Sequence, residues 1–140
     1  MERKNNLLIA SDHRGFKLKN FLLQKYSMID LGTYSEEAVD YNDYAKLLVA
    51  KLQKQNKGIL ICGTGIGMSI AANRYPKVRA ALCYTEEMVK AAREHNDANI
   101  LVLQGDLDEK KAEKFLTLFL ATPFSEEVRH KRRVEKLSSC

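Results

Sequence analysis

The chain has 140 residues, a length that fits one domain. Its 45% hydrophobic and 29% charged residues are usual for a globular protein and exclude a disordered, collagen-like or coiled-coil chain. No apolar run approaches the ~20 residues of a membrane span, and the run after Asn6 is too short for a signal peptide. The three cysteines therefore indicate reduced thiols, and we expect a cytoplasmic protein.

The charge balance favours an anionic partner. Lys and Arg number 23 against 18 Asp and Glu, and the net charge of +5 attracts phosphates or nucleic acid. Much of the excess lies in the run Arg129-His130-Lys131-Arg132-Arg133, which also fits a solvated basic helix end.

Short apolar runs alternate with helical patterns along the chain. We expect helices after Gly15 and from Asp43, where Leu47 and Leu48 mark one apolar face. Thr85 and Ser125 are suited to begin two later helices. Five apolar strands separated by helices predict an α/β doubly wound domain with a parallel sheet covered on both faces. The expected strands cover 7–10, 28–31, 58–62, 79–83 and 99–103, and the other helices cover 68–73 and about 109–121.

Ligands of such sheets bind beyond the carboxyl ends of the strands, and one strand here ends in a glycine-rich loop. The sequence Cys62-Gly63-Thr64-Gly65-Ile66-Gly67-Met68-Ser69 lies between a strand and a helix. Its glycines allow close approach of a ligand, and the N–H groups at the helix start attract an anion. The spacing is neither that of a Walker loop nor that of a dinucleotide fingerprint, and a mere tight turn remains an alternative.

Cys62 stands at the end of that strand and at the start of the following helix. A helix dipole at this place favours the thiolate form of a cysteine, which is its nucleophilic and basic form. We expect Cys83 to be a small buried apolar residue and the terminal Cys140 to be a free thiol.

His95 shares an expected apolar helix stripe with Met88, Ala91 and Ala92, so a core histidine is one interpretation. It also precedes a strand, which places it at the sheet edge opposite Cys62. If both act on one substrate, a second subunit must supply His95. Three scattered histidines without a CxxC or HExxH pattern do not predict a metal site.

Six motifs in chain order together resemble ribose-5-phosphate isomerase B, in the family that includes galactose-6-phosphate isomerase. The resemblance covers about the whole chain. The motifs are Asp12-His13-x-Gly15, Asp40-Tyr41, Cys62-Gly63-Thr64-Gly65-x-Gly67, Ala71-Ala72-Asn73, His95-Asn96-Asp97 and Arg129-His130-x-x-Arg133.

The resemblance implies one Rossmann-like sugar-phosphate isomerase domain over 1–140, with a five-stranded parallel sheet and a C-terminal helix that reaches a partner subunit. It implies interconversion of ribose 5-phosphate and ribulose 5-phosphate in the non-oxidative pentose phosphate pathway. No cofactor, metal, nucleic acid or membrane is expected, and the particle is a homodimer or a dimer of dimers with shared sites.

The resemblance also assigns roles to particular residues. Cys62 is the base, acting through an enediolate that backbone N–H groups stabilise. Ring opening is assigned to Thr64 and His95, and contacts with sugar hydroxyls are assigned to Asp12, Tyr41 and Ser69. The phosphate is assigned to His13, Arg129 and Arg133. The residues around the oxyanion are Gly63, Gly65, Ile66, Gly67 and Asn96.

Three positions test this assignment. Some family members use a glutamate base at the position of Met68, so this chain belongs with the cysteine type. The His-Asn-Asp run favours the pentose phosphate. Asp106 stands where many members carry a phosphate-binding arginine; either it faces solvent, or Arg14 or Lys110 compensates, or phosphate affinity falls.

Two other functions remain open on the sequence. One is isomerisation of a six-carbon sugar phosphate such as allose 6-phosphate. The other is a non-catalytic phosphate- or nucleic-acid-binding module, although the basic residues are not interleaved with aromatic ones.

Overall fold

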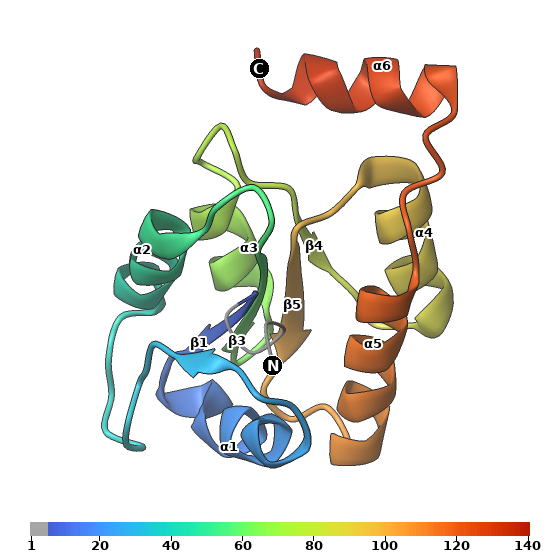
Figure 1. Cartoon of the computed structure of the whole chain (residues 1–140). Helices are drawn as coiled ribbons and strands as arrows, with labels where there is room; N and C mark the ends of the chain where they lie inside the picture. The colour runs from blue at the N-terminus through green and yellow to red at the C-terminus, as the bar shows by residue number, and fades with distance from the viewer. Residues whose placement is uncertain (1–5) are drawn as a thin grey trace.

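The computed structural model describes residues 6–140 and contains one five-stranded parallel sheet. Its order is β2-β1-β3-β5-β4, with every neighbouring pair parallel (Figure 1). The predicted α/β class and the five parallel strands are confirmed. The strands are β1 (Leu7–Ser11), β2 (Ile29–Asp30), β3 (Lys57–Cys62), β4 (Ala80–Leu82) and β5 (Ile100–Gln104).

The helices follow the predicted order, with small shifts at their starts. The second long helix begins at Tyr41, two residues before Asp43, because Asp40 takes the extended cap position. The last begins at Val128, since the Ser125 hydroxyl accepts the Glu127 N–H (3.3 Å) ahead of it. The helices are η2 (His13–Gly15), α1 (Phe16–Lys25), α2 (Tyr41–Lys51), α3 (Ile66–Ala72), α4 (Glu86–Asn96), α5 (Glu109–Ala121) and α6 (Val128–Leu137).

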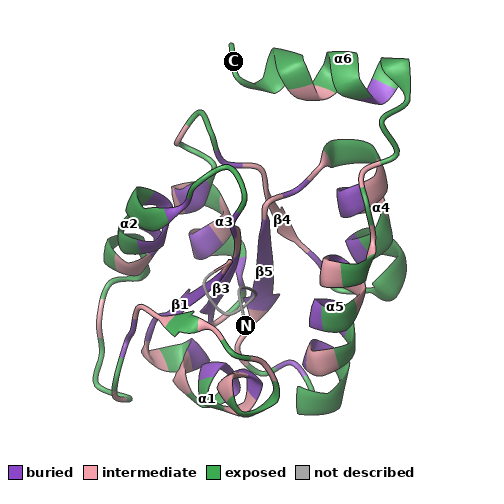
Figure 2. Ribbon diagram, viewed as in Figure 1, coloured by how far each residue is buried: buried purple, intermediate pink, exposed green. Residues whose placement is uncertain are grey.

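Two apolar cores lie on the two faces of the sheet (Figure 2). Successive strand residues point to opposite faces, so Ile59 and Ile61 join one core while Leu60 and Cys62 join the other. Helices α1, α4 and α5 cover the first face, and α2 and α3 cover the second. Cys62 therefore faces the α2–α3 side of the sheet.

Two predicted apolar faces are wrong in detail. Leu47 in α2 is 45% exposed, while Leu48 and Val49 are buried. In α4 the buried residues are Val89, Ala92 and Arg93, so the stripe through Met88 and His95 faces outward. The interpretation of His95 as a core histidine is therefore wrong, because the helix is rotated by about one residue from the predicted face.

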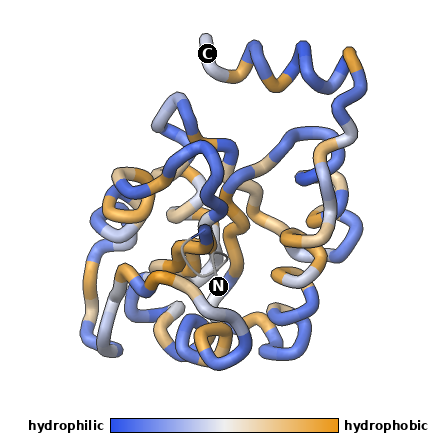
Figure 3. The backbone as a smooth tube through the Cα atoms, in the orientation of Figure 1, coloured by the Kyte–Doolittle hydropathy of each residue, from blue (hydrophilic) through white to orange (hydrophobic). Residues whose placement is uncertain are grey.

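Helix α6 stands apart from the sheet, beyond the end of α4 (Figure 1). The tube coloured by hydropathy shows mostly hydrophilic residues along it, in contrast to the hydrophobic central strands (Figure 3). Of its residues, only His130 is buried. Within residues 6–140, no helix has the length and apolar character that crossing a membrane requires.

A buried ion pair holds the β2 edge of the sheet. Lys19 of α1 is fully buried, and its Nζ lies 2.8 Å from Oδ1 of Asp30. The same oxygen accepts the Gly32 N–H at 3.0 Å, and the Lys19 ammonium lies over the Tyr34 ring. This carboxylate thus neutralises a buried cation and orients the start of the loop that leads to α2.

We expect Asp30→Ala to lower the free energy of unfolding by about 2–3 kcal/mol, because it leaves the Lys19 ammonium buried without its carboxylate. The matched control is Glu36→Ala, which removes an exposed pair with Lys17 (3.7 Å) and should change stability by less than about 0.5 kcal/mol. Urea titration of both variants measures the difference. Equal effects would contradict a structural role for the buried pair.

Candidate active site

The turn after β1 is tied to the end of β3. The Asp12 N–H donates to the Ile61 carbonyl at 3.1 Å. The Asp12 side chain is 5% exposed, and its Oδ1 accepts the N–H groups of Arg14 (2.9 Å) and Gly15 (3.1 Å). A Cβ on Gly15 would lie 2.7 Å from the Ile61 carbonyl oxygen, so only glycine permits this approach. The ends of β1 and β3 therefore lie side by side.

His13 has one ring nitrogen engaged. Its Nδ1 accepts the Val39 N–H at 3.1 Å. In the neutral ring the proton then resides on Nε2, which remains a donor. The contact also ties the loop before α2 to the turn that carries His13.

The glycine-rich loop after β3 has the close contacts that glycine permits. Gly65 has φ of +84°, a left-handed conformation that favours glycine. The Thr64 hydroxyl accepts the N–H of Ile66, the first residue of α3, at 3.1 Å. A Cβ on Gly67 would lie 2.7 Å from Cζ of Tyr41, so the Tyr41 ring packs directly on the loop. Ser69 is half-buried in the second turn of α3.

Cys62 is the last residue of β3 and is 4% exposed. It packs in the same core as Met68 and Ala72 of α3. Its carbonyl accepts the Gly105 N–H at 2.8 Å, which joins this strand end to the loop after β5. The thiol therefore lies beside the glycine-rich loop with little access to bulk water.

His95 and Arg129 lie at the other edge of the sheet. His95 is exposed near the end of α4, and its ring centroid is 4.7 Å from that of His130. His130 Nδ1 is 2.7 Å from the Ser125 hydroxyl. A cavity of about 440 Å³ is lined by both histidines and Arg129. The sequence motif contained His130, but no pattern indicated that it supports the His95 ring.

The end of α4 is held by a second buried cation. Arg93 is 6% exposed, and its Nη1 donates to Asp97 Oδ1 (2.9 Å) and to the Ala98 carbonyl (2.8 Å). Asp97 has φ of 48° and also pairs with Arg79 at 3.3 Å. These contacts give the His95-Asn96 segment a defined position. Sequence analysis had not singled out Arg93.

The chain thus divides the predicted site residues between two edges of the sheet. Asp12, His13, Tyr41 and the residues from Cys62 to Ser69 gather at the carboxyl edge, whereas His95, Asn96, Arg129 and Arg133 lie near the start of β5. Figure 1 shows β5 running away from α6. One protomer does not bring the two groups together.

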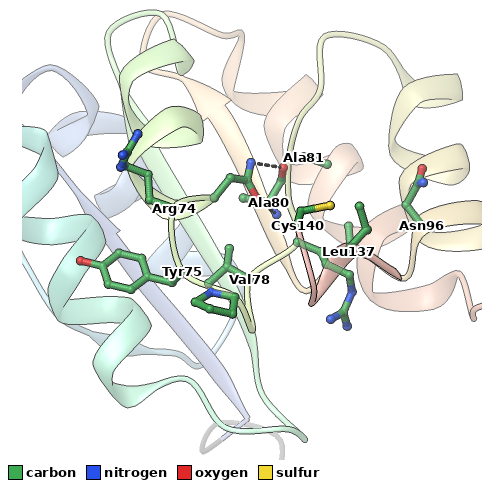
Figure 4. Close-up of a pocket in the computed structure, with 12 residues that line it drawn as sticks. Arg74, Tyr75, Val78, Ala80, Ala81, Asn96, Leu137 and Cys140 are labelled. Atoms are coloured by element: carbon green, nitrogen blue, oxygen red, sulfur yellow. Dashed lines mark hydrogen bonds between the residues drawn. The ribbon is translucent and has the colours of Figure 1, made fainter. Parts of the chain in front are cut away.

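A separate cavity of about 410 Å³ lies between the α3–β4 segment and the end of α6 (Figure 4). Asn96 and Cys140 line it, but Cys62, Thr64 and His95 do not. This cavity is therefore distinct from the group of residues around the glycine-rich loop.

Asp106 is exposed, in agreement with the first of its predicted alternatives. Within residues 6–140, no group of three or more His, Cys, Asp or Glu side chains is arranged to hold a metal ion.

A family model described as Ribose/Galactose Isomerase matches residues 7–137. The chain belongs to the ribose/galactose isomerase family. The sequence-based identification of the family and of an isomerase is confirmed by this match.

Named relatives agree with the family. Ribose-5-phosphate isomerase B of Escherichia coli is 34% identical, over 95% of this chain and 94% of its own length. The crystal structure of a ribose 5-phosphate isomerase from Thermotoga maritima is 51% identical, with a TM-score of 0.89 over 96% of this chain and 97% of that one. Ribose 5-phosphate isomerase B from Anaplasma phagocytophilum is 43% identical, with a TM-score of 0.88 over 94% of each chain.

The other two cysteines differ from Cys62. Cys140 is exposed, with Sγ 3.6 Å from the Lys136 carbonyl. Cys83 is 1% exposed, and burial raises the pKa of its thiol from 9.0 to about 11. The expected role of Cys83 as a buried apolar residue is confirmed.

We expect Cys83 to make the folded state less stable at high pH. Its folded-state pKa lies above the unfolded value, so its contribution is complete below pH ~9 and is lost as pH rises towards about 11. The loss amounts to about 2 kcal/mol. Urea unfolding of the wild type and Cys83→Ala from pH 8 to 11 measures it, and parallel stability curves would contradict the expectation.

Proposed function

We propose that this protein interconverts ribose 5-phosphate and ribulose 5-phosphate, with Cys62 as the base, in the non-oxidative branch of the pentose phosphate pathway. The observation that carries the proposal is the position of Cys62, at the carboxyl end of β3 and beside the glycine-rich loop. The named activity of the relatives, at up to 51% identity over nearly the whole chain, supports the same substrate.

The chemistry requires a base and a stabilised oxyanion. The Cys62 thiolate takes the proton from C2 of the open-chain aldose, which yields an enediolate. The hydroxyl proton passes from O2 to O1, and the thiol returns its proton to C1, which leaves the ketone at C2. The N–H groups of the loop from Gly63 to Gly67 stabilise the negative oxygen. The low exposure of Cys62 supports this role, because few waters compete for the oxyanion.

The polar residues around the loop supply substrate contacts in this proposal. Asp12 uses Oδ1 to cap its turn, which leaves Oδ2 for a sugar hydroxyl, and Tyr41 and Ser69 provide two further hydroxyls. The free Nε2–H of His13 binds the phosphate. Thr64 and His95 open the furanose ring, and Asn96 assists at the oxyanion.

We propose that each site is completed by a second copy of the chain. His95, Arg129 and Arg133 lie at the opposite edge from Cys62, and α6 extends away from its own sheet (Figure 1). Apolar side chains of α3 and of the start of α4 are exposed, with Ile66 at 51% and Ile70 at 59%. A two-fold dimer buries such a surface and carries the second group of residues to the first.

We expect Cys62→Ala to reduce kcat at least ~100-fold, because it removes the base from the reacting carbon. Cys83→Ala is the matched control: it also replaces a buried thiol, and activity should remain within about 2-fold. Ketose formation from ribose 5-phosphate measures both. Full activity of Cys62→Ala would contradict the proposed mechanism.

Two inactive variants should complement each other. A heterodimer of Cys62→Ala and His95→Gln contains one site with both native residues, so random assortment restores about a quarter of wild-type activity. The measurement is ketose formation after the two variants are refolded together, with each refolded alone as the control. Failure to recover activity would show that both residues act from one protomer.

A further inference from the structure

Arg14, the residue after His13, lies against the glycine-rich loop at the carboxyl edge of the sheet. The Arg14 guanidinium fills the space that a Cβ on Gly63 would need, with Cζ, Nη1 and Nε all in contact with that position. Because three atoms of the planar group lie against one point, its flat face rests on the glycine-rich loop. The Arg14 carbonyl fills the corresponding space at Gly105.

Two neighbouring loops therefore hold Arg14 in place. The Gly105 N–H donates to the carbonyls of Cys62 (2.8 Å) and Gly63 (3.1 Å), which brings the two glycines together. The Arg14 N–H donates to Asp12, so its backbone is fixed as well. A side chain on either glycine would displace the arginine.

The guanidinium held in this way has no hydrogen-bond or salt-bridge partner among residues 6–140, and the residue is exposed. The edges of the guanidinium plane, which carry the N–H donors, remain available for a ligand. Lys110 lies in the first turn of α5, and none of its atoms is among the three nearest to the Cβ position of Gly63 or of Gly105.

We propose that Arg14 is a substrate-binding residue that holds the phosphate group of the sugar phosphate. The proposal rests on the proposed isomerase function and adds a residue to its phosphate site. A guanidinium matches a phosphate with two parallel N–H···O bonds. His13 precedes it and presents Nε2–H, so one short turn supplies both donors.

Arg14 is better placed to bind the phosphate of the substrate than to bind the enediolate. Arg14 is exposed at the rim, whereas Cys62, where the enediolate forms, is 4% exposed. The exposed acid Asp106 adjoins Gly105, and the positive charge of Arg14 offsets its repulsion of an anion at this edge.

The test is Arg14→Gln, with Lys17→Gln as the control of equal charge change on a neighbouring exposed residue. We expect Arg14→Gln to raise KM for ribose 5-phosphate about 10- to 100-fold with kcat within about 2-fold. Arg14→Lys should restore part of the loss, because it retains the charge without the planar group. Lys17→Gln should leave both constants unchanged.

Calorimetric titration with inorganic phosphate separates this proposal from the isomerase proposal. Weaker phosphate binding by Arg14→Gln but not by Lys17→Gln supports the assignment even if the wild type fails to isomerise ribose 5-phosphate. Unchanged KM and phosphate affinity in Arg14→Gln would overturn it. A fall in kcat at constant KM would also overturn it, since that pattern places Arg14 at the enediolate.

Discussion

The close approach of three loops at the carboxyl edge of the sheet is the constraint on which the rest of this structure depends. Strands β1, β3 and β5 are adjacent and parallel, so the segments after them leave the sheet on the same side. Gly15, Gly63 and Gly105 lie where these segments touch, and each lacks space for a Cβ. Backbone contacts at Gly15 and Gly105, together with the Arg14 side chain at Gly63, therefore position the predicted site residues of this edge.

Buried cations stabilise the segments that carry the remaining predicted site residues. Lys19 pairs with Asp30 at the sheet edge that leads towards Val39 and Tyr41. Arg93 pairs with Asp97 where α4 ends, next to His95. Both cations are buried, and a buried charge that loses its partner is costly. These ion pairs therefore help to position the predicted site residues at both ends of the strands.

The separation of the two edges also explains why a single protomer is an incomplete enzyme in the proposed mechanism. Because β3 and β5 are parallel, residues that follow β3 and residues that precede β5 lie at opposite ends of the strands. In the proposed dimer, the second copy covers the exposed apolar residues of α3, and α6 extends from its own sheet towards that copy. Catalysis and assembly then depend on the same topology.

The class of fold, the order of its elements, the family and the residues at the strand ends were all predictable from the amino-acid sequence. Those features follow from local patterns: apolar runs, cap residues such as Thr85, and a glycine-rich loop after a strand. The sequence also predicted that His95 and Cys62 lie at opposite edges, because strand direction alone determines that. The roles of the site residues stay predictions.

Three features became visible only in the folded chain: which side of α4 is buried, how Arg14 lies on Gly63, and that the rings of His130 and His95 are in contact. Residues Met88 and Val89 are adjacent, so an apolar pattern can place either of them inward. The contacts of Arg14 and His130 join segments that are distant in the chain, and their choice depends on the packing of neighbouring backbone, which no local pattern contains.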